Sequence, residues 1–327
     1  MYGFDNIFHT DIMKNLINNV KKSNIHHAYI FEGSEGLGKK NAAALFACAV
    51  ICKNSSSAPC GICSGCIQAR AGSSPDIKVI SKGDKKSIGV DKIREEIIED
   101  VIIKPFSSMY KVYIIEDAHL MTEGAQNAFL KVLEEPPSYT VFILTVSDSS
   151  LMLNTVYSRC VAVRFPPLSD SDMLEYIKNK YPDETRLDFL VKYSEGIPKN
   201  ADDIISDPDF EFIRQKLADI TSYLFSQSKY DAFKIAEFFE EYKSSAYAVF
   251  SLWQKIIRDI VIIQEDSDII INSDMRESLS ELALYTDEKK VIYAVSRLTL
   301  AMQMLKRYVN LRAVVLNLAL SVKNYKC

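Results

Sequence analysis

The sequence predicts an α/β fold in the first half of the chain and an all-helical remainder. Short apolar strand candidates alternate with helical patterns up to about residue 166, and the first candidate leads into a glycine-rich loop. No convincing strand follows Pro166 and Pro167. Alternating strands and helices are typical of a parallel sheet covered by helices. We therefore expect domains over residues 1–166, 167–207 and 208–327.

Length and composition limit the class of protein. The chain has 327 residues, 48% of them hydrophobic and 25% charged, which suits two or three packed domains and excludes a disordered chain. The net charge of −4 gives no overall basic field for nucleic acid. The apolar runs are shorter than a membrane span, and residues 1–16 do not resemble a secretory signal. We expect a cytoplasmic location and no membrane partner.

Hydrophobic spacing places the individual elements. Apolar residues three or four positions apart predict helices over residues 7–22, 41–51, 90–101 and 126–133, and a long helix near residues 296–323. Short apolar runs predict strands over residues 27–32, 76–80, 111–117, 141–146 and 161–165. The segment of about residues 48–72 is rich in Ser, Gly and Pro beyond residue 52, which predicts a loop excursion outside the core.

Residues 33–40 form a candidate phosphate-binding loop between a strand and a helix. Its G-x-x-x-x-G-K pattern contains Gly33, Gly36, Gly38 and Lys39. Glycines allow backbone N–H groups to turn toward phosphate oxygens, and the lysine supplies a cation. The next position normally carries a Ser or Thr hydroxyl that binds Mg²⁺, but here it is Lys40. The loop predicts a nucleotide-binding fold with weak or absent ATP binding.

The third predicted strand ends in two acids, Glu116 and Asp117. In an active ATPase the first acid is an Asp that holds Mg²⁺, and the second polarises the attacking water. The order is reversed here, which changes the reach of each carboxylate by one methylene in a reaction that depends on positioning. We interpret the loop and these acids as a degenerate nucleotide site.

Five of the seven cysteines cluster within 19 positions, which favours a metal over disulfides. Cys60, Cys63 and Cys66 have C-x₂-C-x₂-C spacing, and Cys52 lies eight residues upstream. Four thiolates around one ion make a closed structural site, so we expect a zinc module with Zn²⁺ as its cofactor. An iron–sulfur cluster shares this spacing and is the competing interpretation. Cys48, one helical turn before Cys52, is the alternative fourth ligand.

Several longer motifs resemble the clamp-loader branch of the AAA+ proteins. The matching segments are residues 27–31, 33–39, the four cysteines, and residues 72–76, 112–121, 125–137 and 158–160. Residues 126–137 together with Ser158, Arg159 and Cys160 are highly specific, whereas the glycine loop alone is not. The resemblance is close over about the first 200 residues and general in the helical remainder.

The resemblance implies a RecA-like AAA+ domain with a zinc-module insertion, a small helical lid and an all-α collar that holds a five-membered ring. Such rings load a sliding clamp onto primed DNA as part of the bacterial DNA polymerase III holoenzyme. The implied partners are gamma/tau motor subunits and a delta subunit, with clamp and DNA contacted through the complex. The resemblance also implies that Arg159 is an arginine finger for a neighbouring subunit's nucleotide; by itself it would be an ordinary surface charge.

Three departures from the motor subunits imply a subunit that does not hydrolyse ATP. Lys40 replaces the hydroxyl, the acids are reversed, and Asn200 stands near the position of the motors' phosphate-sensing arginine, with Lys199 beside it. An ATP-hydrolysing motor of the gamma/tau type is the alternative, and would carry Ser or Thr at position 40. A nucleic-acid-reading cysteine module is disfavoured, because residues 53–71 contain two cations and no aromatic side chain.

Overall fold

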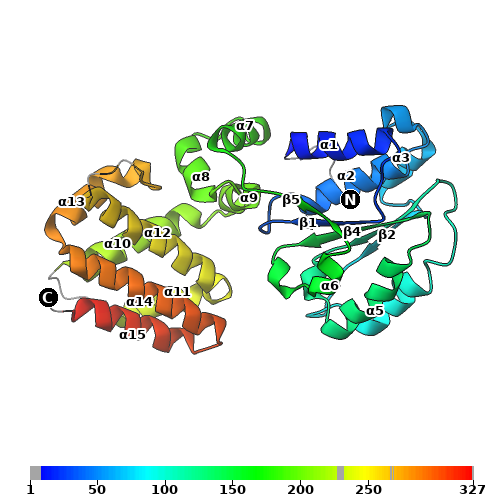
Figure 1. Ribbon diagram of the computed structural model, residues 1–327. Coiled ribbons are helices and arrows are strands. Elements are labelled where there is room, and N and C mark those ends of the chain that lie inside the picture. The colour runs from blue at the N-terminus through cyan, green and yellow to red at the C-terminus, as the bar shows by residue number, and fades with distance from the viewer. Residues whose placement is uncertain (1–8, 227–231, 266, 268, 326–327) are drawn as a thin grey trace. The chain divides into compact units, whose positions relative to one another are not determined.

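The computed structural model describes residues 9–226, 232–265, 267 and 269–325. The chain forms two compact units (Figure 1). The first reaches to Met173 and includes Gly196–Lys199, and the second comprises Leu174–Glu195 and the chain from Asn200 onward. The three domains expected from the sequence remain a prediction, because this division is into two.

The first unit is built on a five-stranded parallel sheet. Its strands are β1 (Ala28–Glu32), β2 (Ile77–Ile80), β3 (Lys111–Ile115), β4 (Thr140–Val146) and β5 (Val161–Arg164). They lie in the order β2-β3-β4-β1-β5, and every pairing is parallel. The predicted parallel α/β sheet is therefore confirmed, each strand lying within or one residue from its expected range.

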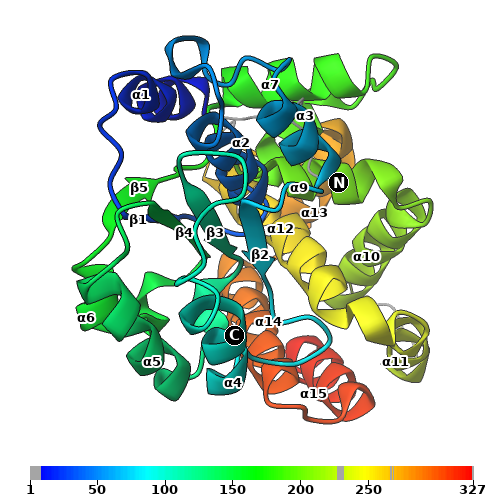
Figure 2. The ribbon, with the colours of Figure 1, turned by 90° about the vertical axis from the view of Figure 1, so that its right-hand side faces the viewer.

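Helices cover both faces of this sheet (Figures 1 and 2). One layer contains α1 (Thr10–Lys21), α2 (Lys39–Val50) and α3 (Ser64–Ala71), and the other contains α4 (Val90–Ile93), α5 (Glu123–Glu134) and α6 (Asn154–Tyr157). Alternate strand residues serve the two layers: Tyr29 and Phe31 pack with α2, whereas Ala28 and Ile30 belong to the core on the side of α5. Residues 7 and 8 of the first predicted helix lie outside the described residues.

The second unit is helical, as expected, and no strand follows Arg164 in the part of the chain that the structure describes. Its helices are α7 (Asp170–Lys180), α8 (Leu187–Ser194), α9 (Pro198–Ser206), α10 (Phe210–Phe225), α11 (Ala232–Glu241), α12 (Ala246–Gln264), α13 (Arg276–Tyr285), α14 (Glu288–Lys306) and α15 (Leu311–Lys323). The first residues of α7 and of α9 belong to the first unit. A short non-helical connection separates α9 from α10, at the position where the sequence predicts a boundary near Pro208.

Two local predictions are wrong. The long helix expected near residues 296–323 is divided into α14 and α15, because the Asn310 side chain accepts a hydrogen bond from the Ala313 N–H and so starts a new helix. The cysteine segment is not only a loop outside the core: it contains α3, and Ala58, Cys66 and Ala69 are buried in the core on the α2 side of the sheet. Its polar composition concealed these small buried side chains.

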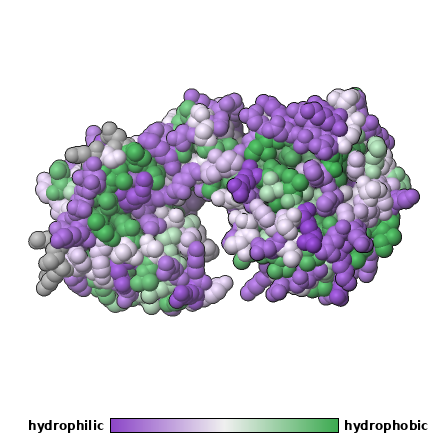
Figure 3. Space-filling model, viewed as in Figure 1, coloured by the Kyte–Doolittle hydropathy of each residue, from purple (hydrophilic) through white to green (hydrophobic). Residues whose placement is uncertain are grey.

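No helix among the described residues has the length and apolar content needed to cross a membrane. On the face shown in Figure 3, hydrophilic and hydrophobic residues are interspersed on both units. Some of the most exposed apolar side chains lie on the last helices and their connections: Leu284, Tyr285, Ile292, Tyr308 and Leu320.

Candidate functional site

The glycine loop lies between β1 and α2 and is shaped by close backbone packing. Gly33 has φ +150°, and a Cβ there would lie 2.3 Å from the carbonyl oxygen of Phe165. Gly36 has φ +89°, and a Cβ there would lie 2.6 Å from the Cβ of Lys199. Gly38 has φ +77° and immediately precedes the first residue of α2. Only glycine suits these positions without rearrangement, so the loop has the tight form that its pattern predicts.

Lys39, the first residue of α2, turns back onto the loop. Its Nζ donates hydrogen bonds to the carbonyl oxygens of Gly33 at 2.6 Å and Ser34 at 2.7 Å. The side chain is buried, and burial lowers the pKa of Lys39 to about 8. The ammonium therefore bonds to the loop itself.

Lys40 contacts both acids at the end of β3. Its Nζ lies 2.7 Å from Asp117 Oδ2 and 3.2 Å from Glu116 Oε2. Burial opposes the charged form of Lys40, but hydrogen bonds to the two carboxylates outweigh it and raise its pKa above the ordinary value. Asp117 has a positive φ of 51°, and its N–H donates to the buried Thr145 hydroxyl on β4. Two of the three departures from the motor-subunit pattern, Lys40 and the reversed acid pair, are therefore in direct contact.

The segment Gly196–Lys199 covers the loop within the same unit. Lys199 Nζ forms an ion pair of 2.7 Å with Glu35 Oε1 in the middle of the loop, and this contact lowers the pKa of Glu35. Ile197 Cγ2 would lie 2.8 Å from a Cβ at Gly36. The side chain of Lys199, the neighbour of Asn200 in the sequence, is therefore directed toward the loop, where it pairs with a carboxylate.

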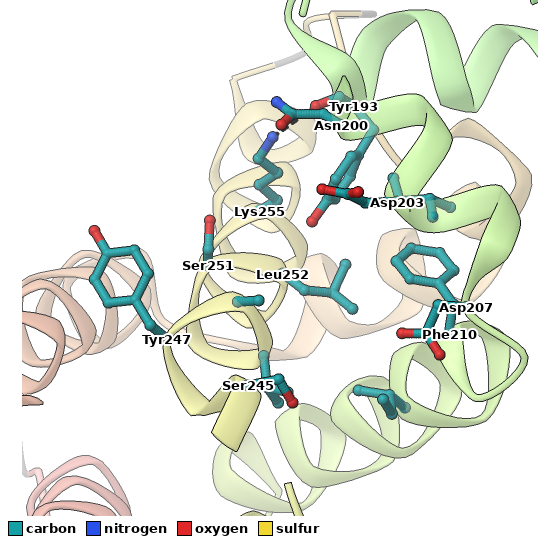
Figure 4. A pocket seen from close by; sticks show the side chains of 14 residues that line it. Tyr193, Asn200, Asp203, Asp207, Phe210, Ser245, Tyr247, Ser251, Leu252 and Lys255 are labelled. Atoms are coloured by element: carbon teal, nitrogen blue, oxygen red, sulfur yellow. Dashed lines mark hydrogen bonds between the residues drawn. The ribbon is translucent and has the colours of Figure 1, made fainter. Parts of the chain in front are cut away.

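Asn200, at the expected sensing position, belongs to the second unit. Its side-chain amide donates to the Ser194 carbonyl oxygen at 3.2 Å, and it lines a cavity of about 270 Å³ (Figure 4). Lys255 of this cavity donates to the Tyr193 carbonyl oxygen and pairs with Glu195. None of the residues assigned to nucleotide, metal or finger roles lines this cavity.

Arg159 lies in the turn between α6 and β5. Its Nη2 pairs with Glu134 Oε1 at 2.8 Å, and its Nη1 donates to the Thr155 carbonyl oxygen at 2.8 Å. The arginine side chain is 36% exposed and Glu134 is 50% exposed. The two motifs that make the resemblance most specific, residues 126–137 and 158–160, therefore meet through this ion pair.

The four predicted metal ligands come together beside the sheet. Cys52 follows α2, Cys60 and Cys63 lie in the connecting loop, and Cys66 lies in the first turn of α3. Their sulfur atoms are all within 4.8 Å of one another, with 4.0 Å between the Cys52 and Cys63 sulfurs and between those of Cys60 and Cys66. Cys48 is buried in the core and is not one of this group.

This geometry fits a single tetrahedral ion. Bonds of about 2.3 Å place tetrahedral sulfur ligands about 3.8 Å apart, close to the separations here. Backbone N–H groups of Cys60, Cys63 and Cys66 approach the sulfurs of Cys52, Cys60 and Cys63 at 3.4–3.5 Å. Burial would raise the pKa of Cys63, but hydrogen bonds that include the Cys66 N–H lower it, whereas burial raises the pKa of Cys52 and of Cys66.

Sequence reasoning missed the partners of the site residues. Glu35 and Glu134 lie inside motifs that the sequence singled out, but their ion pairs join residues 164 and 25 positions apart. Local patterns do not indicate which distant charges meet. The only sequence signal for a role of Glu35 and Glu134 was their position inside those motifs.

Comparison with known proteins shows which proteins the chain is similar to. A family model described as DNA polymerase III, delta subunit, matches residues 8–169. The chain is 27% identical to the DNA polymerase III subunit delta′ of Bacillus subtilis over 320 residues, which is 95% of each chain. It is 37% identical to the tau subunit of the same organism over 177 residues, 54% of this chain and 31% of that protein.

A solved structure titled as a gamma subunit-related protein of DNA polymerase III from Thermotoga maritima aligns with a TM-score of 0.47 and 18% identity. That alignment covers 96% of this chain and 99% of the other. The parallel sheet covered by helices on both faces, with a glycine loop between β1 and α2, defines an α/β protein of the nucleotide-binding type. The chain is similar to DNA polymerase III clamp-loader subunits, over 95% of its length in the case of the delta′ relative.

Proposed function

We propose that the chain acts as a delta′-type subunit of the clamp loader, which helps to load the sliding clamp onto primed DNA without hydrolysing ATP itself. The observation that carries this proposal is the contact of Lys40 with both acids of its own nucleotide site. Similarity over the full length supports it as well, because the delta′ relative matches 95% of this chain, whereas tau and gamma relatives match about half.

The nucleotide site lacks the groups that ATP hydrolysis needs. Mg²⁺ is held in such sites by a Ser or Thr hydroxyl and an acid, and it neutralises the developing charge on the phosphates. An ammonium has three donors and no acceptor, so Lys40 offers no ligand to a cation. The Lys39 ammonium, which would reach the phosphates, bonds to Gly33 and Ser34. We therefore expect weak or absent ATP binding and no turnover by the isolated chain.

Arg159 is the residue that we assign to catalysis in trans. Its guanidinium is partly exposed and is bound to Glu134 and not to the acids of its own site. A guanidinium is always charged and can contact two phosphate oxygens at once, which suits an arginine finger at the nucleotide of an adjacent subunit.

The four cysteines would hold a structural zinc ion that keeps the segment between α2 and α3 folded. A closed set of four thiolates leaves no position for a substrate, so the ion would stabilise structure and carry out no reaction. An iron–sulfur cluster contains several iron atoms and holds its cysteine sulfurs further apart than a single ion does, so separations of 4.0 Å favour one ion. Metal analysis separates zinc from a single iron.

The helical remainder would provide the lid, over residues 167–207, and the collar, over residues 208–327. The exposed apolar residues of the last helices support a surface for other subunits. The proposed partners are gamma/tau and delta subunits, with the clamp and primed DNA reached through the complex in the bacterial cytoplasm.

Reconstitution tests this function. Native mass spectrometry of the chain mixed with gamma/tau and delta subunits should show one copy in each ring. The Arg159→Ala variant should enter the ring, keep its metal, and lower clamp loading and DNA-stimulated ATP hydrolysis. Arginine fingers contribute about 10³–10⁵ in rate in GTPases, and one finger among several sites should have a smaller effect. Arg159→Lys should not restore the full rate.

Arg164→Ala is the matched control, since Arg164 is an exposed arginine five residues further on that pairs with Glu32. It should leave clamp loading unchanged. Full clamp loading by the Arg159→Ala ring would overturn the finger assignment. ATP turnover by the isolated chain that disappears in Lys39→Ala would instead favour the motor-subunit alternative.

A further inference from the structure

We infer that Lys40 is a built-in replacement for the magnesium ion of this nucleotide site. The inference rests on the proposed non-hydrolysing function and gives its physical basis. Glu116 and Asp117 are neighbouring carboxylates whose side chains are 13% and 29% exposed, and Lys40 Nζ contacts an oxygen of each. Two partly buried like charges repel each other, and a cation between them removes that repulsion. Lys40 supplies this cation from the first turn of α2.

The residues present do not fit a magnesium ion. Mg²⁺ requires nearly octahedral oxygen ligands at about 2.0–2.1 Å. Here an ammonium already donates to Asp117 Oδ2 at 2.7 Å and lies 3.2 Å from Glu116 Oε2. A divalent ion would have to displace that ammonium or sit beside it, and the position that should supply a hydroxyl ligand is occupied by Lys40 itself. The ion that the fold family implies is therefore excluded by the chain's own side chain.

The charges around the loop balance without a ligand. Three lysines and three acids lie there: Lys39, Lys40, Lys199, Glu35, Glu116 and Asp117. Lys199 pairs with Glu35, Lys40 pairs with the two acids of β3, and Lys39 is hydrogen-bonded to the loop carbonyls. A site that is neutral and hydrogen-bonded by itself gains little from a cation. The first unit can therefore keep its loop and acids in place in the absence of a magnesium nucleotide.

One substitution should reverse this arrangement. Lys40→Thr removes the ammonium and places a hydroxyl at the position that normally binds Mg²⁺. The two acids then lose the ammonium that both of them contact, and carboxylate oxygens are ligands that Mg²⁺ prefers. The inference therefore predicts that a single threonine converts a closed site into a divalent-cation site.

The experiment titrates the full chain with Mn²⁺, a paramagnetic ion with Mg²⁺-like ligand preferences, and measures bound ion by electron paramagnetic resonance. Wild-type protein should bind Mn²⁺ at this site only weakly. The Lys40→Thr variant should bind one Mn²⁺ about tenfold or more tightly than wild type, and Mn²⁺ should raise the melting temperature of this variant alone. Adding Asp117→Asn to the Lys40→Thr variant should abolish the gain.

Two further variants separate the contributions. Lys92→Thr is the matched control, because Lys92 also pairs with a glutamate, Glu96, but lies outside the loop. It should behave as wild type. Lys40→Arg keeps a positive charge and should bind Mn²⁺ as weakly as wild type. If Lys40→Thr does not fold, Lys40→Met serves instead: without the ammonium, Mn²⁺ binding should still rise above that of wild type.

Two outcomes would overturn the inference. One is a folded Lys40→Thr protein that binds Mn²⁺ no more tightly than wild type. The other is wild-type protein that already binds one Mn²⁺ tightly and loses it in Asp117→Asn. Either result would leave the proposed function intact, because that is decided by the ATP turnover of the isolated chain and by the Arg159 variants of the ring.

Discussion

The first unit contains two groups of potential metal ligands, the cysteine cluster and the acid pair. The negative charge of each group is balanced in a different way. The four cysteine sulfurs converge within 4.8 Å, and backbone N–H groups of the cluster point toward three of them. The two carboxylates of Glu116 and Asp117 share the ammonium of Lys40. A lysine can replace an ion between two oxygen ligands, whereas four converging thiolates leave a space the size of one metal ion.

The largest effect should follow from removing a cysteine ligand. We expect inductively coupled plasma mass spectrometry to find one zinc ion per chain in wild-type protein and none in Cys52→Ala, because a closed four-thiolate site depends on each ligand. The segment between α2 and α3 should become sensitive to protease while the sheet stays folded. Cys48→Ala is the control: it removes a buried thiol one helical turn away and should keep the metal.

A zinc-free Cys48→Ala protein would show that Cys48 and not Cys52 is the fourth ligand. If the gently purified wild-type protein contained iron or no metal, the cluster would not be a zinc site, and its contrast with the acid pair would be wrong.

The charge of Asp76 is balanced in a third way, mainly by backbone N–H groups, with a further hydrogen bond from the Ser107 hydroxyl. Its buried carboxylate accepts hydrogen bonds from the N–H groups of Phe106, Ser107 and Ser108 at 2.5–2.9 Å. Burial opposes the charged form, but these donors lower the pKa of Asp76 below its ordinary value. Asp76→Asn should lower the free energy of unfolding by about 2 kcal/mol, because an amide cannot accept all these bonds. Urea unfolding measures the change.

The pH dependence of Asp76 follows from the direction of its shift. A carboxyl group with a lowered pKa stabilises the folded state above its unfolded pKa of about 3.9, and this contribution is lost as the pH falls through the folded pKa. The difference between wild type and Asp76→Asn should therefore shrink below about pH 4. The exposed Asp84→Asn is the control and should change little. An equal difference at all pH values would contradict this account.

Lys40→Met should have a smaller effect on stability than Asp76→Asn. The Lys40 side chain is 44% exposed, and solvent weakens an exposed ion pair, so a loss of about 1 kcal/mol or less is expected. Added salt should reduce the difference between wild type and variant, because it screens both the attraction in wild type and the repulsion left in the variant. A loss as large as that of Asp76→Asn, insensitive to salt, would mean that Lys40 acts through packing.

Sequence patterns predicted the fold better than the contacts of the site. Helices and strands follow from apolar periodicity within a few residues, so β1 to β5 lie where expected. The Lys40–Asp117 pair joins residues 77 positions apart, and its formation depends on β3 lying near the loop in the finished sheet. The division at Asn310 was missed because apolar spacing continues across it, while one side-chain cap decides where α15 begins.

The smallest expected effect concerns Glu134, which pairs with Arg159. Both side chains are substantially exposed, so Glu134→Gln should change the free energy of unfolding by less than about 0.5 kcal/mol. In the reconstituted ring the same variant should lower DNA-stimulated ATP hydrolysis modestly, by a factor of about 2–3, because a less constrained guanidinium spends less time in one orientation. Glu135→Gln, at the exposed neighbouring position, should have no effect.

The decisive measurement is the double variant. If Glu134 acts by positioning Arg159, Glu134→Gln adds no further loss to Arg159→Ala, since the effects of residues that act together are not additive. An equal loss in both backgrounds would show that Glu134 serves the ring through another contact.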